Sequence, residues 1–198
     1  GGVVVRSKGT RITNGLVRST KTTARSDQSY RHGIWVTGTS AVGDGGVDLY
    51  ISDVDMDLLT EFAGQDIYGI YCQVPLVRAA IKNCNISGFS AHGIWISSVT
   101  TDFVEIVGNT INCASQVGTP GVTGYHGILF THAGSPVNAR SRVVKVSDNT
   151  IISPLYSGVR FQGGVSVGTP SNSITISRNL ISGYGLRGVD LPATSYFG

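Results

Sequence analysis

The chain has 198 residues, which is the size of one domain and is enough to bury a hydrophobic core. Hydrophobic residues make up 40% of it and charged residues only 14%, a composition that excludes intrinsic disorder. The net charge of +3 comes from scattered basic residues and indicates no nucleic-acid partner, and the longest apolar runs are too short for a membrane span. Valine and isoleucine far outnumber leucine, which favours strands over helices.

Two motifs alternate along the chain. The first has the form x-Gly-aliphatic-x-hydrophobic. The second has the form aliphatic-x-aliphatic-x-x-Asn-x-Ile and is weaker in its first two copies. In chain order, the strands predicted from them fall at 32–36, 49–56, 68–72, 79–86, 92–96, 104–111, 126–130, 144–151, 157–161, 174–181 and 187–191. A motif that recurs six times predicts a repeat architecture rather than a sandwich.

We interpret the repeat as an all-β fold, a parallel β-solenoid of about six turns with loop insertions. We expect residues 1–198 to form a single β-helix domain that is a segment of a longer chain. The connection from the second motif to the next copy of the first keeps a constant length in three of five cases, as from Val146 to Val159, whereas the other connections vary. Alternation along each strand directs Ile34 inward and Trp35 outward.

A corner is predicted directly after the second strand, where Asn109, Asn149 and Asn179 align on consecutive turns. Stacked amides there can form hydrogen bonds along the axis, and asparagine tolerates the left-handed backbone that a sharp corner needs. The three cysteines are an odd number without metal-ligand spacing, so we expect buried free thiols. We expect neither a metal site nor a cofactor.

The pairing of an Asn-Thr-Ile corner with a Gly-Ile-x-aliphatic strand resembles the right-handed parallel β-helix of the pectin-lyase-like superfamily, over residues 30–191. The resemblance implies a carbohydrate-active protein, because the superfamily includes pectate lyases, polygalacturonases, alginate-modifying enzymes and bacteriophage tailspike depolymerases. Irregular turn lengths and low charge are most similar to a tailspike, which implies a homotrimer located in the virion (phage tail) or extracellularly. The chain carries no catalytic motif of a pectate lyase or polygalacturonase, so no active-site residue is carried over.

The outward position of the first strand forms a column along the axis. On successive turns it reads Trp35, Tyr71, Trp95, Leu129, Arg160 and Asp190. Solvent-facing aromatic side chains suit sugar rings, and Arg160 suits a carboxylate or sulfate, so Trp35, Tyr71, Trp95 and Arg160 are predicted to bind substrate. The walls of this groove would be three insertions, at 37–46, 57–67 and 112–125. The alternative is that a loop or a neighbouring subunit covers the column.

A second column precedes the Gly-Ile pair and contains His32, His92 and His126. Imidazoles that titrate near neutrality can transfer protons. The alternative is that they are corner residues bonded to the backbone.

Candidate catalytic carboxylates lie beside the aromatic column. Hydrolysis of a glycosidic bond needs two carboxylates about 5–9.5 Å apart. Glu61 and Asp66 lie in the insertion before Tyr68, Asp44 lies in the opposite wall, and Asp190 is in the column itself.

A lyase would need a base and a cation, roles that suit His92 or His126 with Arg160. We therefore expect binding and depolymerisation of a bacterial surface polysaccharide. The alternatives are a non-catalytic adhesin or trimeric shaft, and a secreted bacterial lyase or epimerase.

Overall fold

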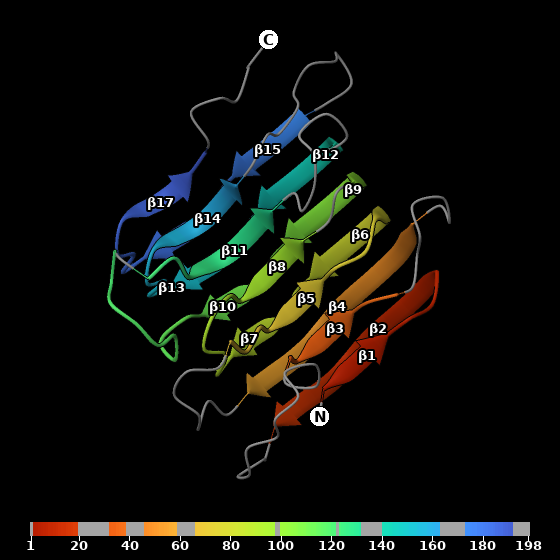
Figure 1. The fold of residues 1–198 in the computed structure, drawn as a ribbon, viewed down its shortest axis with the longest axis horizontal. Helices are drawn as coiled ribbons and strands as arrows, with labels where there is room; N and C mark the ends of the chain where they lie inside the picture. The colour runs from red at the N-terminus through yellow and green to blue at the C-terminus, as the bar shows by residue number, and fades with distance from the viewer. Residues whose placement is uncertain are drawn as a thin grey trace.

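The computed structural model describes residues 2–19, 32–38, 46–58, 66–97, 100–121, 123–131, 140–162 and 173–191. It is all-β with parallel strands in two stacked sheets (Figure 1), which confirms the predicted fold class at that level and is compatible with a solenoid. Within these ranges, no helix combines the length and the apolar character that crossing a membrane requires.

The first sheet has seven parallel strands, in the order β1 (Val3–Val5), β3 (Ile34–Val36), β5 (Ile70–Cys72), β8 (Ile94–Ser97), β11 (His126–Thr131), β14 (Ser157–Gln162) and β17 (Arg187–Asp190). The six strands of this sheet that follow β1 contain the six copies of the Gly-aliphatic motif. Each pairs with the copy that comes next along the chain, so equivalent residues of successive copies lie side by side.

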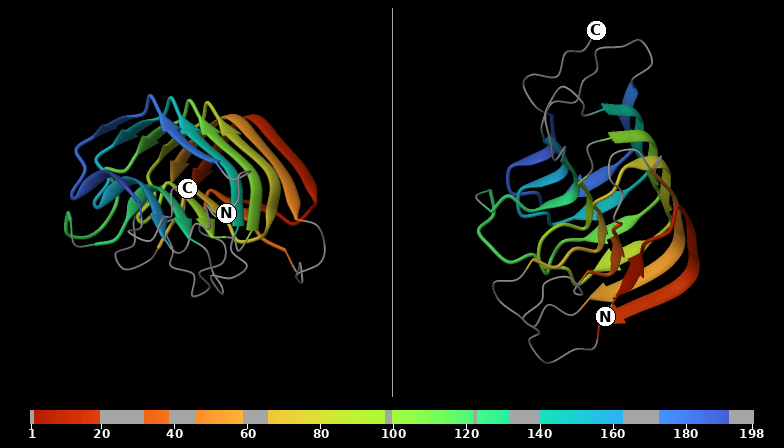
Figure 2. Two further views of the ribbon diagram at one scale, coloured as in Figure 1. Left: turned by 90° about the horizontal axis from the view of Figure 1, so that it is seen from above. Right: turned by 45° about the vertical axis from the view of Figure 1, so that its right-hand side comes forward.

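The second sheet contains the other predicted strands. Its order is β15 (Ser173–Ser177), β12 (Arg140–Ser147), β9 (Thr100–Val107), β6 (Leu76–Lys82), β4 (Val47–Leu58), β7 (Asn85–Ser87), β10 (Thr110–Asn112), β13 (Thr150–Ile152) and β16 (Leu180–Ser182), with β2 (Gly9–Ser19) paired to β4. The long strand β4 pairs with β6 through its first half and with β7 through its second. The sheet therefore has two arms, and Figure 2 shows the strong bend of its strands.

A left-handed residue makes the bend between the two arms. Each described layer has one such residue, with φ between 52° and 70°. In chain order they are Asn14, Asp53, Asn83, Gly108, Asp148 and Arg178. The prediction that Asn109, Asn149 and Asn179 themselves take this conformation was wrong, because each directly follows the left-handed residue. The bend directs these three side chains along the stack, where they form the predicted amide ladder. Asn109 Nδ2 donates to Asn149 Oδ1 and Asn149 Nδ2 donates to Asn179 Oδ1, both at 2.9 Å.

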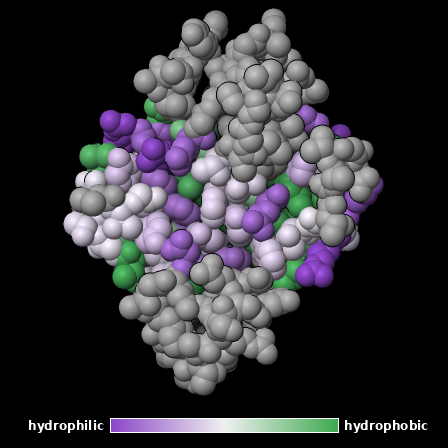
Figure 3. Space-filling view, viewed as in Figure 1, coloured by the Kyte–Doolittle hydropathy of each residue, from purple (hydrophilic) through white to green (hydrophobic). Residues whose placement is uncertain are grey.

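The core lies between the first sheet and the two arms of the second. Its files run from layer to layer, for example Ile34, Ile70, Ile94, Ile128 and Val159, all fully buried. The cysteines Cys72, Cys84 and Cys113 are buried free thiols, as predicted. On the face drawn in Figure 3, the described hydrophobic residues form small separate areas, as expected when most apolar side chains point inward.

A file of glycines brings the first sheet close to one arm of the second sheet, the arm that contains β7, β10, β13 and β16. We call this the second arm. A Cβ built on Gly93, Gly127 or Gly158 would come within 2.4 Å of an isoleucine Cγ2 on that arm. The glycine of the Gly-aliphatic motif is therefore required by close packing.

Candidate functional site

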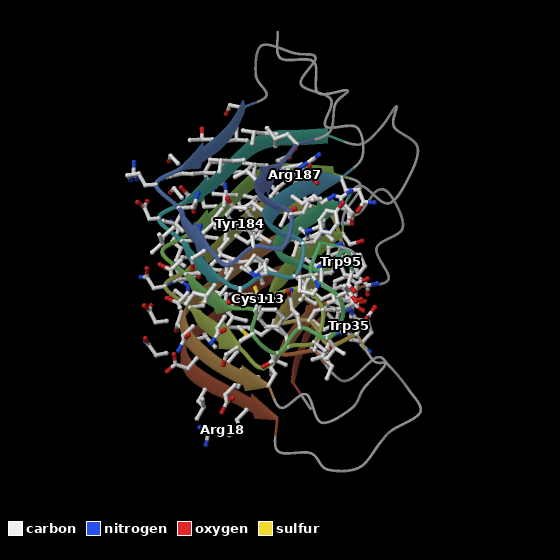
Figure 4. The ribbon with its side chains drawn as sticks, turned by 90° about the vertical axis from the view of Figure 1, so that its left-hand side faces the viewer. Arg18, Trp35, Trp95, Cys113, Tyr184 and Arg187 are labelled. Atoms are coloured by element: carbon white, nitrogen blue, oxygen red, sulfur yellow. The ribbon has the colours of Figure 1, made fainter. Side chains whose placement is uncertain are left out.

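The outer face of the seven-stranded sheet carries the predicted column. Register pairs join Trp35, Tyr71, Trp95, Leu129, Arg160 and Asp190 in an unbroken file. The predicted alignment is therefore confirmed. In Figure 4, Trp35 and Trp95 lie on one side of the molecule and Arg18 lies on the other.

Exposure along the file differs from the prediction. Trp35 and Trp95 are partly exposed, but Tyr71 is only 9% exposed and Leu129 only 3%. The prediction that three consecutive aromatics face solvent is therefore wrong for Tyr71, which packs in a hydrophobic cluster with Tyr68 and Ala91. The file offers two tryptophans with a buried tyrosine between them.

The second predicted column packs beside the first as a stack of rings. The rings of His32 and Tyr68 lie 4.7 Å apart, those of Tyr68 and His92 5.5 Å, and those of His92 and His126 5.5 Å, all stacked. In the first column, Tyr71 stacks on Trp95 at 4.4 Å. We call these seven residues the aromatic ladder: His32, Trp35, Tyr68, Tyr71, His92, Trp95 and His126.

Edge contacts join the two columns of the aromatic ladder, and hydrogen bonds fix the rings of the first column. Trp95 meets the ring of Tyr68 edge-on at 4.8 Å, and its indole N–H donates to Thr131 Oγ1 at 2.7 Å. The indole N–H of Trp35 donates to Gln73 Oε1, and Gln73 Nε2 donates to the hydroxyl of Tyr71, both at 2.6 Å. The polar groups of Trp35, Tyr71 and Trp95 therefore already have hydrogen-bond partners within the protein. The faces and edges of the rings remain for contact with other groups.

The ladder histidines are neutral at neutral pH. Burial lowers the pKa of His32 to about 4 and the pKa values of His92 and His126 to about 3. His32 Nδ1 accepts from the backbone N–H of Tyr68 at 3.4 Å, and His92 Nδ1 accepts from that of His126 at 3.1 Å. The proton of each of these two rings is therefore on Nε2. The prediction that the histidines titrate near neutrality is wrong, and the alternative of backbone-bonded corner residues fits His32 and His92.

Asp66 is the predicted carboxylate that lies at the aromatic ladder. Its Oδ2 accepts from the hydroxyl of Tyr68 at 3.3 Å, and its Oδ1 accepts from the hydroxyl of Tyr125. Burial first, and the charge of Asp66 next, raise the pKa of Tyr68, while burial and the hydrogen bond to Asp66 raise the pKa of Tyr125 to about 12. Both phenols therefore stay protonated and act as donors. The other insertion acids, Glu61 and Asp44, lie outside the described residues.

Asp190 and Arg160 occupy the far end of the first column and pair with each other. Asp190 Oδ2 lies 3.5 Å from Arg160 Nε, and Arg187 also contacts this carboxylate. Arg160 lies over the ring of Tyr156 at 5.3 Å. Asp66 precedes β5 and Asp190 ends β17, four strand steps away, which corresponds to about 19 Å. The strands next to these two carboxylates therefore lie farther apart than the two carboxylates of a glycosidase.

Sequence reasoning missed two residues that complete the site. Tyr125 packs edge-on against His92 at 5.5 Å, and Gln116 links layers by accepting from the N–H of Leu155 at 2.7 Å and donating to the carbonyl of His126 at 3.1 Å. Both follow β10 in a segment that carries no repeat signal. Tyr125 directly precedes the His-Gly-Ile motif of its layer. An aromatic residue at that position is a sequence signal for a ring beside the aromatic ladder.

Among the described residues, no group of three or more His, Cys, Asp or Glu side chains is close enough to hold a metal ion. Compared with models of protein families, with curated proteins and with solved structures, the chain matches none of them.

Proposed function

We propose that this chain is a right-handed parallel β-helix, of the pectin-lyase-like kind, that binds a bacterial surface polysaccharide along its aromatic ladder. The observation that carries the proposal is the ladder itself, with Trp35 and Trp95 partly exposed on either side of the buried Tyr71. Trp95 is held by its stack on Tyr71 and by its bond to Thr131, so little side-chain freedom is lost on binding. Flat, ordered aromatic surfaces suit the apolar faces of sugar rings.

The wider assignment follows the resemblance in the sequence. We place the chain in a phage tailspike-like homotrimer, in the virion or extracellular, that depolymerises the glycan it binds. Of the two chemistries, hydrolysis is favoured over elimination, because a pKa of about 3 makes His92 and His126 weak bases near neutrality. Asp66 would be one carboxylate of the pair, with Glu61 of the same insertion as the other.

The second candidate function is a non-catalytic shaft whose ladder packs between subunits. The observation that favours it is the burial of Tyr71 together with a set of polar groups that already satisfy one another. Such a surface can be covered by another chain at little desolvation cost.

The two candidates are separated by tryptophan fluorescence, because the only tryptophans of the chain, Trp35 and Trp95, are both in the ladder. We expect a panel of capsular and O-antigen polysaccharides to include one that shifts the emission of the full chain and protects it from acrylamide quenching. Trp95→Ala should abolish binding, whereas Tyr184→Ala, which removes an aromatic side chain that is 49% exposed and outside the ladder, should not. Tryptophans shielded in an oligomer, with no response to any glycan, would support the shaft and contradict glycan binding.

Cleavage is a separate measurement on the same polysaccharide. Shorter products with new reducing ends indicate hydrolysis, and shorter products that absorb in the ultraviolet indicate elimination. Loss of cleavage with retained binding in Asp66→Asn would support the assigned role. Unchanged cleavage in that variant would remove Asp66 from the reaction.

A further inference from the structure

The outer face of the second sheet contains a hollow of about 490 Å³, on a different sheet from the aromatic ladder. Strands β2, β4, β6 and β9 form its floor, and the side chains around it include Arg11, Asp48, Tyr50, Arg78 and Phe103. The register explains the depression. Ala80 lies between Tyr50 and Glu105 on neighbouring strands, and Gly9 lies beside Asp48, so two short residues interrupt files of long side chains.

Cationic groups in this hollow are available for a ligand. The guanidinium of Arg11 lies over the ring of Tyr50 at 4.6 Å, which orients it while leaving its N–H groups to other partners. Arg11 and Arg78 are both exposed, and neither forms an ion pair with another described residue. The neighbouring acid Glu105 is already engaged by Lys82 at 2.5 Å and by Lys145 at 3.7 Å.

The remaining lining groups suit a sugar rather than a simple anion. Phe103 is 38% exposed and provides an apolar wall. Asp48, which is exposed, is the one carboxylate among the residues that line the hollow, and a carboxylate accepts hydrogen bonds from hydroxyl groups. A ligand that satisfies all of these groups has an apolar ring face, hydroxyl donors and a negative charge.

We propose that this hollow binds a uronic acid residue of an oligosaccharide, with Arg11 and Arg78 on its carboxylate, Asp48 on its hydroxyls and Phe103 against its ring. Planar guanidinium groups bind carboxylates in two-point fashion, which selects the carboxylate of a uronic acid over a neutral sugar. The site is on a different sheet from the ladder and does not depend on the function proposed above.

The test is a titration of the ¹⁵N-labelled full chain with trigalacturonate, followed by amide chemical shifts. We expect saturable shifts at Tyr50, Ala80 and Phe103 at millimolar ligand, and none with the fully methyl-esterified trisaccharide, in which the charge is removed. Absence of shifts at these amides with trigalacturonate overturns the proposal, as does equal binding of the ester.

Variants separate a built site from general attraction to a basic face. Arg78→Gln and Arg11→Gln should each weaken binding at least tenfold. Lys145→Gln, which removes a cation of the same sheet face outside the hollow, should change it less than twofold. Equal weakening by Lys145→Gln would show non-specific charge attraction and contradict the site. Trp95→Ala should leave this titration unchanged, so failure here and failure of the ladder are distinguishable.

Discussion

The side-chain amide of Asn109 donates a hydrogen bond of 2.9 Å to the side-chain oxygen of Asn149, one layer along the stack. Asn149 repeats the contact with Asn179 at the same distance. The oxygen of each acceptor also receives a backbone N–H, from Asn109 and from Asn149 respectively, at 3.0 Å. Since Asn109 and Asn149 are each only 1% exposed, these amides are interior structural groups.

Replacing Asn149 with alanine should therefore be costly. The substitution removes two accepted bonds from Asn109 and two donated bonds, to Asn179 and to the carbonyl of Ile106. Buried partners left unsatisfied cost about 1–3 kcal/mol each, and we expect the free energy of unfolding to fall by about 3 kcal/mol in urea titration. Asn85→Ala, at an exposed position of β7, is the matched control and should change it by less than about 0.5 kcal/mol. Equal effects of the two substitutions would show that the amide ladder contributes no stability.

Gly127→Ala tests the close approach of the first sheet to the second arm. The added methyl group would lie 2.4 Å from Ile151 Cγ2 and 2.8 Å from the carbonyl oxygen of Gly158. We expect a loss of about 1–3 kcal/mol in unfolding free energy from overpacking. Gly124→Ala, three residues earlier, meets no atom within 4 Å and should be neutral or slightly stabilising. A tolerated Gly127→Ala would mean that the two sheets can separate without cost.

The three histidines of the aromatic ladder, His32, His92 and His126, should make the folded chain less stable in acid. Their folded-state pKa values of about 3 to 4 lie below the value of 6.5 expected in the unfolded chain, so the unfolded state binds more protons between these limits. The free energy of unfolding should therefore fall as the pH decreases from about 6.5 towards 3. His92→Phe keeps a ring in the stack but removes one titrating group, so the slope of stability against pH should become shallower. ¹H–¹⁵N spectra of the imidazoles should show no protonation of His92 between pH 5 and 8, and a midpoint near 6.5 would contradict its burial.

The three cysteines should be inert in the folded protein. Burial raises the pKa of Cys72 to about 12 and raises the pKa values of Cys84 and Cys113, so almost no thiolate forms at neutral pH. A disulfide reagent should label none of them in buffer and all three in denaturant, as measured by mass spectrometry. Rapid labelling of Cys113 in buffer would indicate local opening near β10.

The repeat motif predicted most of what lies inside the fold. Gly-Ile strands and the Asn corner are visible in sequence because each layer must present the same residue types to the layers above and below it. The first layer was not predicted. Val3–Val5 and Gly9–Ser19 pair with later strands, but neither contains a Gly-Ile motif or a corner asparagine followed by isoleucine. Backbone hydrogen bonds to the next layer are enough to form these two strands. Such bonds do not require particular side chains, so the sequence does not indicate them.

The outer surface could be predicted only in part. The alternation of Ile34 and Trp35 correctly separated inside from outside, but it could not show that Tyr71 would be covered by rings from the preceding corner. Nor could it show that Asp66 would reach Tyr125, since their contact joins segments 59 residues apart through side chains alone. The hollow beside Arg78 depends on which short residues happen to be neighbours across strands, and that requires the register.

The amide ladder also has a mechanical consequence. Its hydrogen bonds run in the same direction as those between the parallel strands, so a pull along the stack would load side-chain and main-chain bonds together. Tension applied in that direction must break several bonds at one time in the region of Asn109 and Asn149, whereas peeling an outermost strand breaks them one after another. A molecule built in this way resists stretching most strongly in its middle and yields first at its ends.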